Sequence, residues 1–334
     1  MPQPDVSDVH VNAPLTQVSV GYQPGGFFAT RAFPVINVDK QTDIYVTYDK
    51  SHFARDMGGP GAAPTGSHGM WRAPGTRARV AGYTVNMDQT YRCKNYALGF
   101  EISDELRGNA DSVFNLDRDA VLLLTSLLNL RYDREFTADH LATSKWADQT
   151  ITNKWSDYAA STPIEDLREA WDTIRKGTLS MSVDGGCHLL IGSLVSRRLL
   201  DHPDLLERIK YGGANTSPAQ VSLEMLAQIV GIDDVRVGYS VYTSDEEGTA
   251  EASVTYSNVF EDDALLYWTP RGSNQLAPSA GFLFNWRPLT GGGLYFVRKG
   301  RNEREKYDWI EVHSYLDWKL VTKDSGVYMD DACD

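Results

Sequence analysis

The chain has few cysteines, no long apolar run and no surplus of positive charge, and each shortage excludes a class of protein. Its three cysteines, Cys93, Cys187 and Cys333, are far apart and odd in number, which fits a reducing compartment rather than a disulfide framework. Residues 1–20 lack the basic start and apolar stretch of a secretory signal, and no run is long enough to cross a bilayer. We expect a soluble intracellular protein whose thiols are buried or incidental.

The net charge argues against nucleic-acid binding as the main role of this protein. The formal net charge is -13, whereas binding a phosphate backbone needs a basic surface, so any nucleic acid should be contacted weakly. With 42% apolar and 23% charged residues, the composition is that of a globular protein. The 334 residues are enough for a substantial core divided between two compact units.

Signatures of catalysis and metal binding are also scarce. The seven histidines include no pair at helical metal-ligand spacing. Residues 291–293 lack the lysine and the hydroxyl residue of a phosphate loop, and Ser67 lies in a loop rich in glycine and proline rather than at a strand-turn-helix elbow. Acidic clusters such as residues 261–263 are interpreted as solvated faces. We expect no enzymatic activity, no cofactor and no metal.

What the sequence does contain is one long helical pattern over Asn109–Ala142. At about 1.5 Å per residue it would span roughly 45 to 50 Å. A long strand near the C-terminus, with apolar residues alternating from Ile310 to Leu320, should pack against this helix. The residues expected on the buried face of the helix recur at steps of three and four: Val113, Leu116, Ala120, Leu123, Leu127 and Leu130.

The residues before this helix can form strands and an arm but no core of their own. Residues 1–32 contain four prolines and no sustained periodicity, and residues 56–75 are dense in glycine and proline. Alternation at 44–48 and 96–102, and more weakly at 77–85, predicts an extended antiparallel ribbon. Because an isolated two-stranded ribbon is marginal in water, we expect it to lie on a neighbouring copy.

Aromatic residues in the arm, ribbon and loops are the candidate contact residues between subunits. Core filling explains many aromatic side chains, but those on an extended ribbon suit anchoring at an interface. The candidates are Phe27, Phe28, Phe33, Tyr45, Tyr48, Phe53, Trp71 and Trp268.

After the long helix, helices alternate with short strands, which is typical of an α+β domain. A capping box at Thr162–Glu165 starts a helix that stops at Gly177. Further helices are predicted at 193–200, 205–211 and 217–231, and strands at 187–191 and 235–242.

A series of motifs runs through nearly the whole chain. They include Phe33-Pro34-Val35, Val38–Asp43, Gly82–Val85, Ile102–Glu105, His202-Pro203, Pro278–Gly281 and Asp317–Lys319. In this order they resemble the major capsid proteins of tailed bacteriophages with the Hong Kong 97-type fold.

The resemblance implies an α+β capsid fold and a structural role in a virion. Its parts would be an N-terminal arm (1–34), an extended E-loop β-hairpin (35–101), a peripheral domain with a long spine helix (102–158 and 284–334) and an α+β axial domain (159–283). The protein would assemble in the host cytoplasm into pentamers and hexamers of an icosahedral shell around double-stranded DNA, without a membrane. Its partners would be further copies, a scaffolding protein, a portal and a decoration protein, with the packaged DNA contacted weakly and without specificity.

Two traits of some family members do not carry over. The start of the chain is short and non-helical, which implies a separate scaffolding protein. Lys50 and Lys94 lie in or near the ribbon, but no partner asparagine is evident, so a covalent cross-link between subunits is not predicted. Two alternatives stay open: an encapsulin-like nanocompartment that encloses a cargo enzyme, and a soluble α+β hydrolase.

Overall fold

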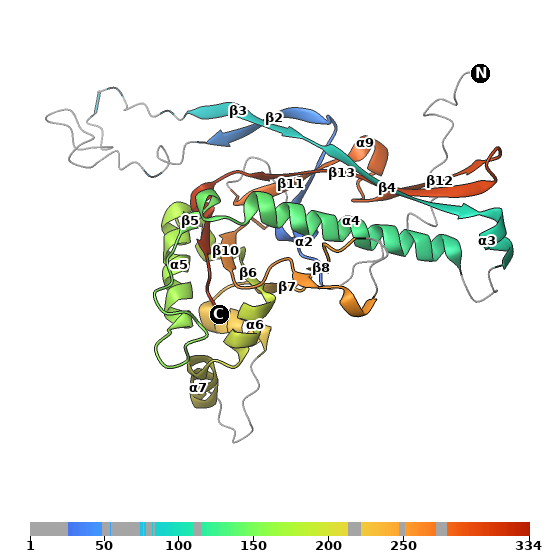
Figure 1. The fold of residues 1–334 in the computed structure, drawn as a ribbon. Coiled ribbons are helices and arrows are strands. Elements are labelled where there is room, and N and C mark those ends of the chain that lie inside the picture. The colour runs from blue at the N-terminus through green and yellow to red at the C-terminus, as the bar shows by residue number, and fades with distance from the viewer. Residues whose placement is uncertain are drawn as a thin grey trace.

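The computed structural model describes residues 26–48, 54, 74–75, 77, 82, 84–109, 115–212, 222–246, 251–271 and 279–334. Within these ranges the chain forms two five-stranded sheets, two two-stranded sheets and a long helix that lies along the first large sheet (Figure 1). The predicted α+β class is confirmed. None of the helices in these ranges is long and apolar enough to cross a membrane.

The first large sheet is built around β13 (Tyr307–Leu320), the long strand predicted near the C-terminus. β13 pairs antiparallel with β4 (Lys94–Ser103), β12 (Phe296–Asn302) and β11 (Gly281–Trp286), and β11 pairs parallel with β1 (Val35–Val38). Apolar side chains alternate along β13 and share one core cluster with the long helix. The predicted strand and its packing are confirmed.

The long helix is α4, Leu116–His140, and it is shorter than predicted. It begins after Asn115, whose side chain accepts a hydrogen bond from the Arg118 N–H at 3.2 Å. A separate helix, α3 (Asp104–Asn109), precedes it, and residues 110–114 lie outside the described residues. The 25 residues of α4 span roughly 37 Å at about 1.5 Å each.

The apolar face predicted for α4 is buried only in part: Ala120 is buried and Leu116 packs against the core, but two leucines of this face are exposed. Leu123 and Leu127 are 48% and 45% exposed, whereas their neighbours Leu124 and Leu128 are buried. Because leucines occupy adjacent positions along residues 122–130, periodicity alone allows two faces, and packing against β13 selects the second. The residues that α4 buries are Ala120, Val121, Leu124, Thr125, Leu128, Asn129, Tyr132, Asp133 and Phe136.

The second large sheet carries the helices predicted after α4. Its strand order is β5 (Ala147–Asp148), β14 (Gly326–Met329), β10 (Ala264–Trp268), β6 (Cys187–Gly192) and β7 (Asp234–Gly238). The helices α5 (Pro163–Gly177), α6 (Ser193–Leu200), α7 (Pro203–Gly212) and α8 (Leu223–Val230) contribute to a second core cluster with this sheet. Because β14 belongs to the C-terminal tail, the tail takes part in both large sheets.

Most boundaries predicted in this second unit are confirmed, with small differences. Helix α5 stops at Gly177 as expected, but Thr162 makes no side-chain capping bond. The predicted start of α8 at 217–220 lies outside the described residues, and the observed N-cap is Ser222. The strand predicted at 235–242 is divided into β7 and a short β8 (Val241–Tyr242), which pairs with β9 (Ser257–Asn258).

The remaining elements are short. The helices are α2 (Ala29–Ala32) and α9 (Arg287–Thr290), with 3-10 turns at Thr143–Lys145, Met181–Asp184, Glu251–Ser253 and Lys323–Ser325. The three cysteines are free and buried, as predicted.

The predicted ribbon is present, but fewer residues belong to it than expected. β2 (Thr42–Tyr48) and β3 (Val85–Arg92) pair antiparallel and extend away from the two large sheets (Figure 1). The flanking strands β1 and β4 belong to the first large sheet, so both ends of the segment are anchored in the chain's own body. The expectation that residues 35–100 find no surface within the subunit is therefore wrong for β1 and β4.

Candidate functional site

The root of the predicted arm is packed inside the chain's own body. The backbone N–H groups of Phe28 and Ala29, at the start of α2, donate to the carboxylate of Asp133 on α4 at 3.2 and 2.8 Å. The Ser240 hydroxyl donates to the other oxygen of the same carboxylate at 2.6 Å. Burial raises the pKa of Asp133 to about 6, although these three donors favour its charged form.

The other end of α2 is held by the second large sheet. The Ala32 carbonyl accepts from the Tyr267 hydroxyl at 2.7 Å and from the Arg236 guanidinium at 3.2 Å. Trp318 of β13 donates its indole N–H to the Ala29 carbonyl at 3.1 Å. A negative group at the start of the helix and a positive group at its end both complement the helix dipole. Residues 26–34 thus connect the two sheets, and the part of the predicted arm before them, residues 1–25, lies outside the described residues.

The root of the ribbon also packs on the subunit itself. Tyr91 stacks on Phe284 of β11 with a centroid distance of 4.4 Å, and Tyr45 lies 5.7 Å from the same ring. The Tyr45 hydroxyl donates to the Leu320 carbonyl at 3.3 Å. Aromatic residues at the root of the ribbon therefore pack in a core of their own subunit, because Phe284 of β11 lies against them.

The eight predicted contact residues fall into three groups. Phe28, Phe33, Tyr45 and Trp268 are buried within the subunit, so most of their surface is unavailable to a neighbour. Phe27 is half-buried, and Tyr48 is placed only as a strand residue of β2. Phe53 and Trp71 lie outside the described residues. That these residues contact another copy stays a prediction.

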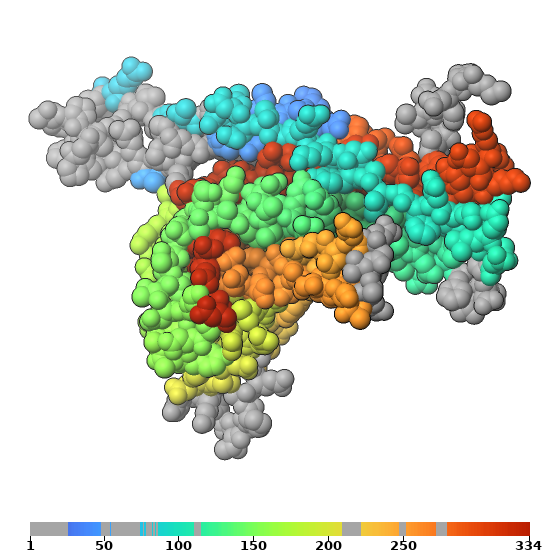
Figure 2. Space-filling model, viewed as in Figure 1, coloured from blue at the N-terminus to red at the C-terminus, as the bar shows by residue number. Residues whose placement is uncertain are grey.

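Other apolar side chains, which the sequence did not single out as contact residues, are exposed instead. On the ribbon these are Ile44 and Met87, 53% and 59% exposed. On α4 they are Leu123 and Leu127, and the outer side of this helix is open on the face seen in Figure 2. Near β8 and β9 they are Tyr239, Val241 and Tyr256. No sequence signal separates them from core residues, since only the packing of the sheets shows which face is covered.

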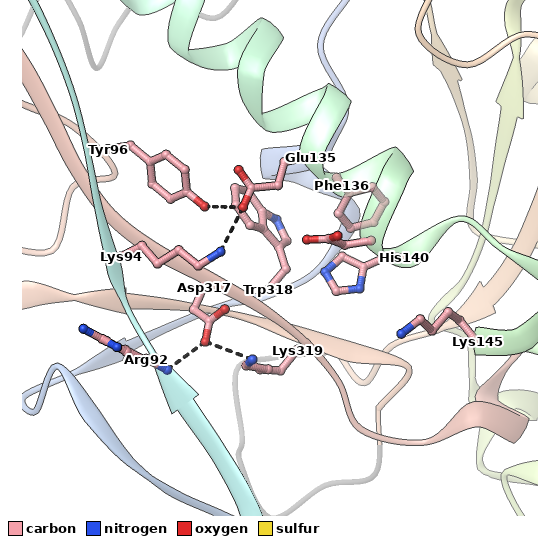
Figure 3. A pocket seen from close by; sticks show the side chains of 11 residues that line it. Arg92, Lys94, Tyr96, Glu135, Phe136, His140, Lys145, Asp317, Trp318 and Lys319 are labelled. Carbon is pink, nitrogen blue, oxygen red and sulfur yellow. Dashed lines mark hydrogen bonds and ion pairs between the residues drawn. The ribbon is translucent and has the colours of Figure 1, made fainter.

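A cavity of about 300 Å³ opens where the ribbon root, the C-terminal turns of α4 and the end of β13 meet (Figure 3). Its lining is mostly charged. The Glu135 carboxylate accepts from the Tyr96 hydroxyl at 2.8 Å and from the Lys94 ammonium at 3.1 Å. The lining residues are Arg92, Lys94, Tyr96, Glu135, Phe136, Asp139, His140, Lys145, Asp317, Trp318 and Lys319.

Burial and pairing fix the charges in this cavity. Burial opposes ionisation of Glu135, but its bonds to Tyr96 and Lys94 outweigh it and hold the pKa of that carboxyl below its usual value. Burial lowers the pKa of His140 to about 4, so the imidazole is neutral at pH 7. Burial raises the pKa of Asp317, whose carboxylate accepts from the Arg92 backbone N–H at 2.8 Å and lies 3.4 Å from the Lys319 ammonium.

In a second polar cluster a carboxylate, an imidazole and a hydroxyl group are linked in that order, which is the order that activates a hydroxyl nucleophile. His188 bonds through Nδ1 to the Asp234 carboxylate, and its Nε2 lies 3.1 Å from the Thr269 hydroxyl. Thr269 is only 5% exposed, so a substrate has little access to the hydroxyl. This chain of bonds joins β6, β7 and the residue after β10. In the described ranges, no group of three or more histidine, cysteine or acidic side chains could hold a metal ion.

Comparison with known proteins identifies the fold. No family model matches the chain. The major capsid protein of Burkholderia phage BcepMu is 22% identical over 277 residues, which cover 80% of each chain. A phage-related protein of Bordetella bronchiseptica has a similar solved structure, with a TM-score of 0.70 and 17% identity over 97% of this chain and 98% of that one.

Two other solved structures have a TM-score of 0.54. The capsid of cyanophage P-SCSP1u is 9% identical and covers 100% of this chain and 94% of its own. The SrpI encapsulin complex of Synechococcus elongatus is 12% identical and covers 100% of this chain and 91% of its own. The chain therefore has the Hong Kong 97-type capsid fold, as the order of its motifs predicted. Its similarity in sequence is to a phage major capsid protein.

Proposed function

We propose that this chain is the major capsid protein of a tailed bacteriophage, a structural subunit that assembles with copies of itself into the icosahedral head. The observation that carries the proposal is the β2–β3 ribbon, which extends from a body of two sheets and exposes Ile44 and Met87. Two paired strands gain little stability alone, and exposed apolar side chains favour contact with another chain. The similarity to the BcepMu major capsid protein supports this choice.

Assembly would proceed through pentamers and hexamers whose contacts are closed by rotation. In this arrangement the ribbon of one subunit lies across the next, and the axial unit, residues 159–283, which contributes β6, β7 and β10 to the second large sheet, faces the centre of each ring. Residues 102–158 and 284–334 form the peripheral unit, in which α4 is the spine. Each subunit then touches several others, so that modest individual contacts add up to a stable shell.

The remaining partners follow from the same proposal. A separate scaffolding protein guides assembly in the host cytoplasm, a portal occupies one vertex, and a decoration protein binds the outer surface. The net charge of -13 limits adhesion of the packaged double-stranded DNA, which is contacted weakly and without sequence preference. The subunit acts without catalytic turnover.

The experiment that tests this function is electron microscopy of the purified protein. Rings, sheets or closed shells are the expected result, whereas small uniform particles at high concentration would contradict it. An encapsulin-like compartment is the second candidate, supported by the likeness to the SrpI encapsulin complex. Nucleic-acid analysis of particles from the native source separates the two, because a phage head holds DNA and a compartment holds protein cargo.

A further inference from the structure

Helix α2 depends on other segments of the subunit for its shape. It has four residues and no side-chain cap, and the Arg31 N–H donates to the Phe28 carbonyl at 2.9 Å. A helix this short is unstable in water by itself. The phenylalanines that flank it pack on the body, where the ring centroid of Phe28 lies 6.0 Å from that of Phe136, and the centroid of Phe33 lies 5.9 Å from that of Tyr267.

The segment that contains α2, residues 26–33, is called here the arm root, and it has a clear limit on each side. At its start the Gly26 carbonyl accepts from the Tyr239 N–H at 3.2 Å. After its end, the Pro34 carbonyl accepts from the Leu283 N–H at 3.0 Å, where β1 begins to pair with β11. The arm root can therefore separate from the body while β1 stays paired. Proteins open locally in contiguous units of this kind, at a lower cost than complete unfolding.

The polar group that holds the start of the arm root is the Asp133 carboxylate, which is 1% exposed. It accepts from the N–H groups of Phe28 and Ala29 and from the Ser240 hydroxyl, and all three donors are neutral. Among the described residues, no cation forms an ion pair with it. An asparagine side chain could make the same number of bonds without a buried charge, so a carboxylate is not the most stable choice for a permanent contact.

The other ionisable side chains around Asp133 are of types that change charge only well above pH 7. On the segments packed against this carboxylate they are Arg31 of α2, Tyr132 and Arg134 of α4, Tyr239 and Tyr242 beside Ser240, and Tyr295 before β12. At the other end of α2, Arg236 contacts Asp234 and His188. A test of Asp133 must therefore leave that histidine in place.

We infer that the arm root separates from the body more often as Asp133 loses its proton, and that it stays closed on α4 when Asp133 is protonated. Separation brings the carboxylate into water, where its charge is no longer penalised. The closed state stays dominant because it buries Phe28 and Phe33, and Asp133 changes only how often it opens. The inference does not depend on the proposed shell function.

The direction of the pH dependence follows from the burial of Asp133. Burial raises its pKa to about 6 in the closed state, whereas an exposed aspartate has a pKa of about 3.9. The closed state thus binds the proton more tightly, and a rise in pH favours opening. The opening constant should increase about tenfold from pH 5 to pH 7.

The test is hydrogen exchange of individual amides in the full-length, unassembled subunit at pH 5, 6 and 7, corrected for the intrinsic rate at each pH. The reporters are the N–H groups of Phe28, Ala29 and Arg31, and the references are the N–H groups that pair β6 with β10. The reporters should be at least about tenfold less protected than the references, and their opening should rise with pH as given above. Equal protection would overturn the inference, because the arm root would then open only with the whole subunit.

Three variants assign the pH dependence to one carboxylate. Asp133→Asn leaves His188 in place and should lose the tenfold rise, with opening at least about tenfold rarer than in wild type at pH 7. Asp263→Asn is the matched control: burial also raises the pKa of this carboxyl, but its partners lie in the C-terminal tail, so the rise should remain. Ser240→Ala removes one donor to the charged form of Asp133, so the rise should continue to higher pH. A rise that neither Asp133→Asn nor Ser240→Ala alters would refute Asp133 as its cause.

Discussion

The Asp133 carboxylate joins three segments of the subunit: α4, the start of α2 and Ser240. Its buried negative charge destabilises the folded state. Burial raises its pKa to about 6 in the folded state, compared with about 3.9 in an unfolded chain. Between these values the folded state binds the proton more tightly, so the free energy of unfolding falls as the pH rises from about 4 to 6. A shift of this size corresponds to roughly 3 kcal/mol at most.

We therefore expect Asp133→Asn to be more stable than wild type at pH 7 by about 2 kcal/mol, with the difference closing towards pH 4. The amide can accept from the Phe28 and Ala29 N–H groups and donate to Ser240, which keeps the contacts without a buried charge. Urea unfolding of the unassembled subunit at several pH values measures the difference. A difference independent of pH would contradict the assigned cause. Asp133→Ala is the control, and it should lose about 1–3 kcal/mol relative to the asparagine variant because the donors are left unpaired.

Gly192, at the junction of β6 and α6, is fixed by the closeness of another backbone. A Cβ atom there would lie 2.0 Å from the carbonyl oxygen of Glu261, so the chain must shift to admit it. Gly192→Ala should destabilise the subunit by about 1–3 kcal/mol. Gly108→Ala in α3 is the matched control, since nothing lies within 4 Å of its Cβ position, and it should be neutral or stabilising by up to about 1 kcal/mol. Thermal unfolding of both variants and of wild type tests whether Gly192→Ala is the less stable of the two variants.

At the level of single elements, α4 allows a test of which face is covered. Leu124→Ala removes a buried side chain and should cost about 2–5 kcal/mol. Leu127→Ala removes a side chain that is 45% exposed and should change the stability of the unassembled subunit by less than about 1 kcal/mol. Denaturant unfolding of the two variants gives the comparison. Equal losses would mean that both faces of α4 are covered in the isolated subunit.

Sequence patterns predicted the helices that pack on the second large sheet well, because each has one apolar face and a clear start or stop, and they predicted β6 and β7 but not β5, β10 or β14. They failed where the deciding information was tertiary. The leucines of α4 occupy two adjacent faces, and only the position of β13 selects one. Likewise, Tyr45 and Phe28 stand in segments without a local core, and nothing nearby in sequence shows that Phe284 and Phe136 would cover them. The charged cavity combines three separate segments, so no local motif could indicate it.

In the described part of the subunit, residues 26–34 and the C-terminal tail connect the two large sheets. Residues 26–34 contribute α2, whose backbone is bonded by side chains from α4 and from β7, β10 and β13. The C-terminal tail contributes β13 to one sheet and β14 to the other. Because residues 26–34 and the C-terminal tail are tied into the body, the ribbon is the described part best able to leave it for a neighbour. Removing the ribbon should therefore separate folding from assembly.

In the last prediction, residues 44–90 are replaced by Asn-Gly, which joins Asp43 to Tyr91 across a registered pair of the ribbon as a tight hairpin. Tyr91 can still stack on Phe284, and β1, β4 and both large sheets are untouched, so a cooperatively unfolding subunit is expected. This variant should form no particles in sedimentation or microscopy. Ile44→Asp is the control that keeps the ribbon: it alters a side chain that is 53% exposed, should change subunit stability by less than about 0.5 kcal/mol, and should weaken assembly. Shells from the deletion variant, formed as readily as from wild type, would show that the ribbon does not connect subunits and that other exposed surfaces, such as those of α4 or of β8 and β9, supply the main contacts instead.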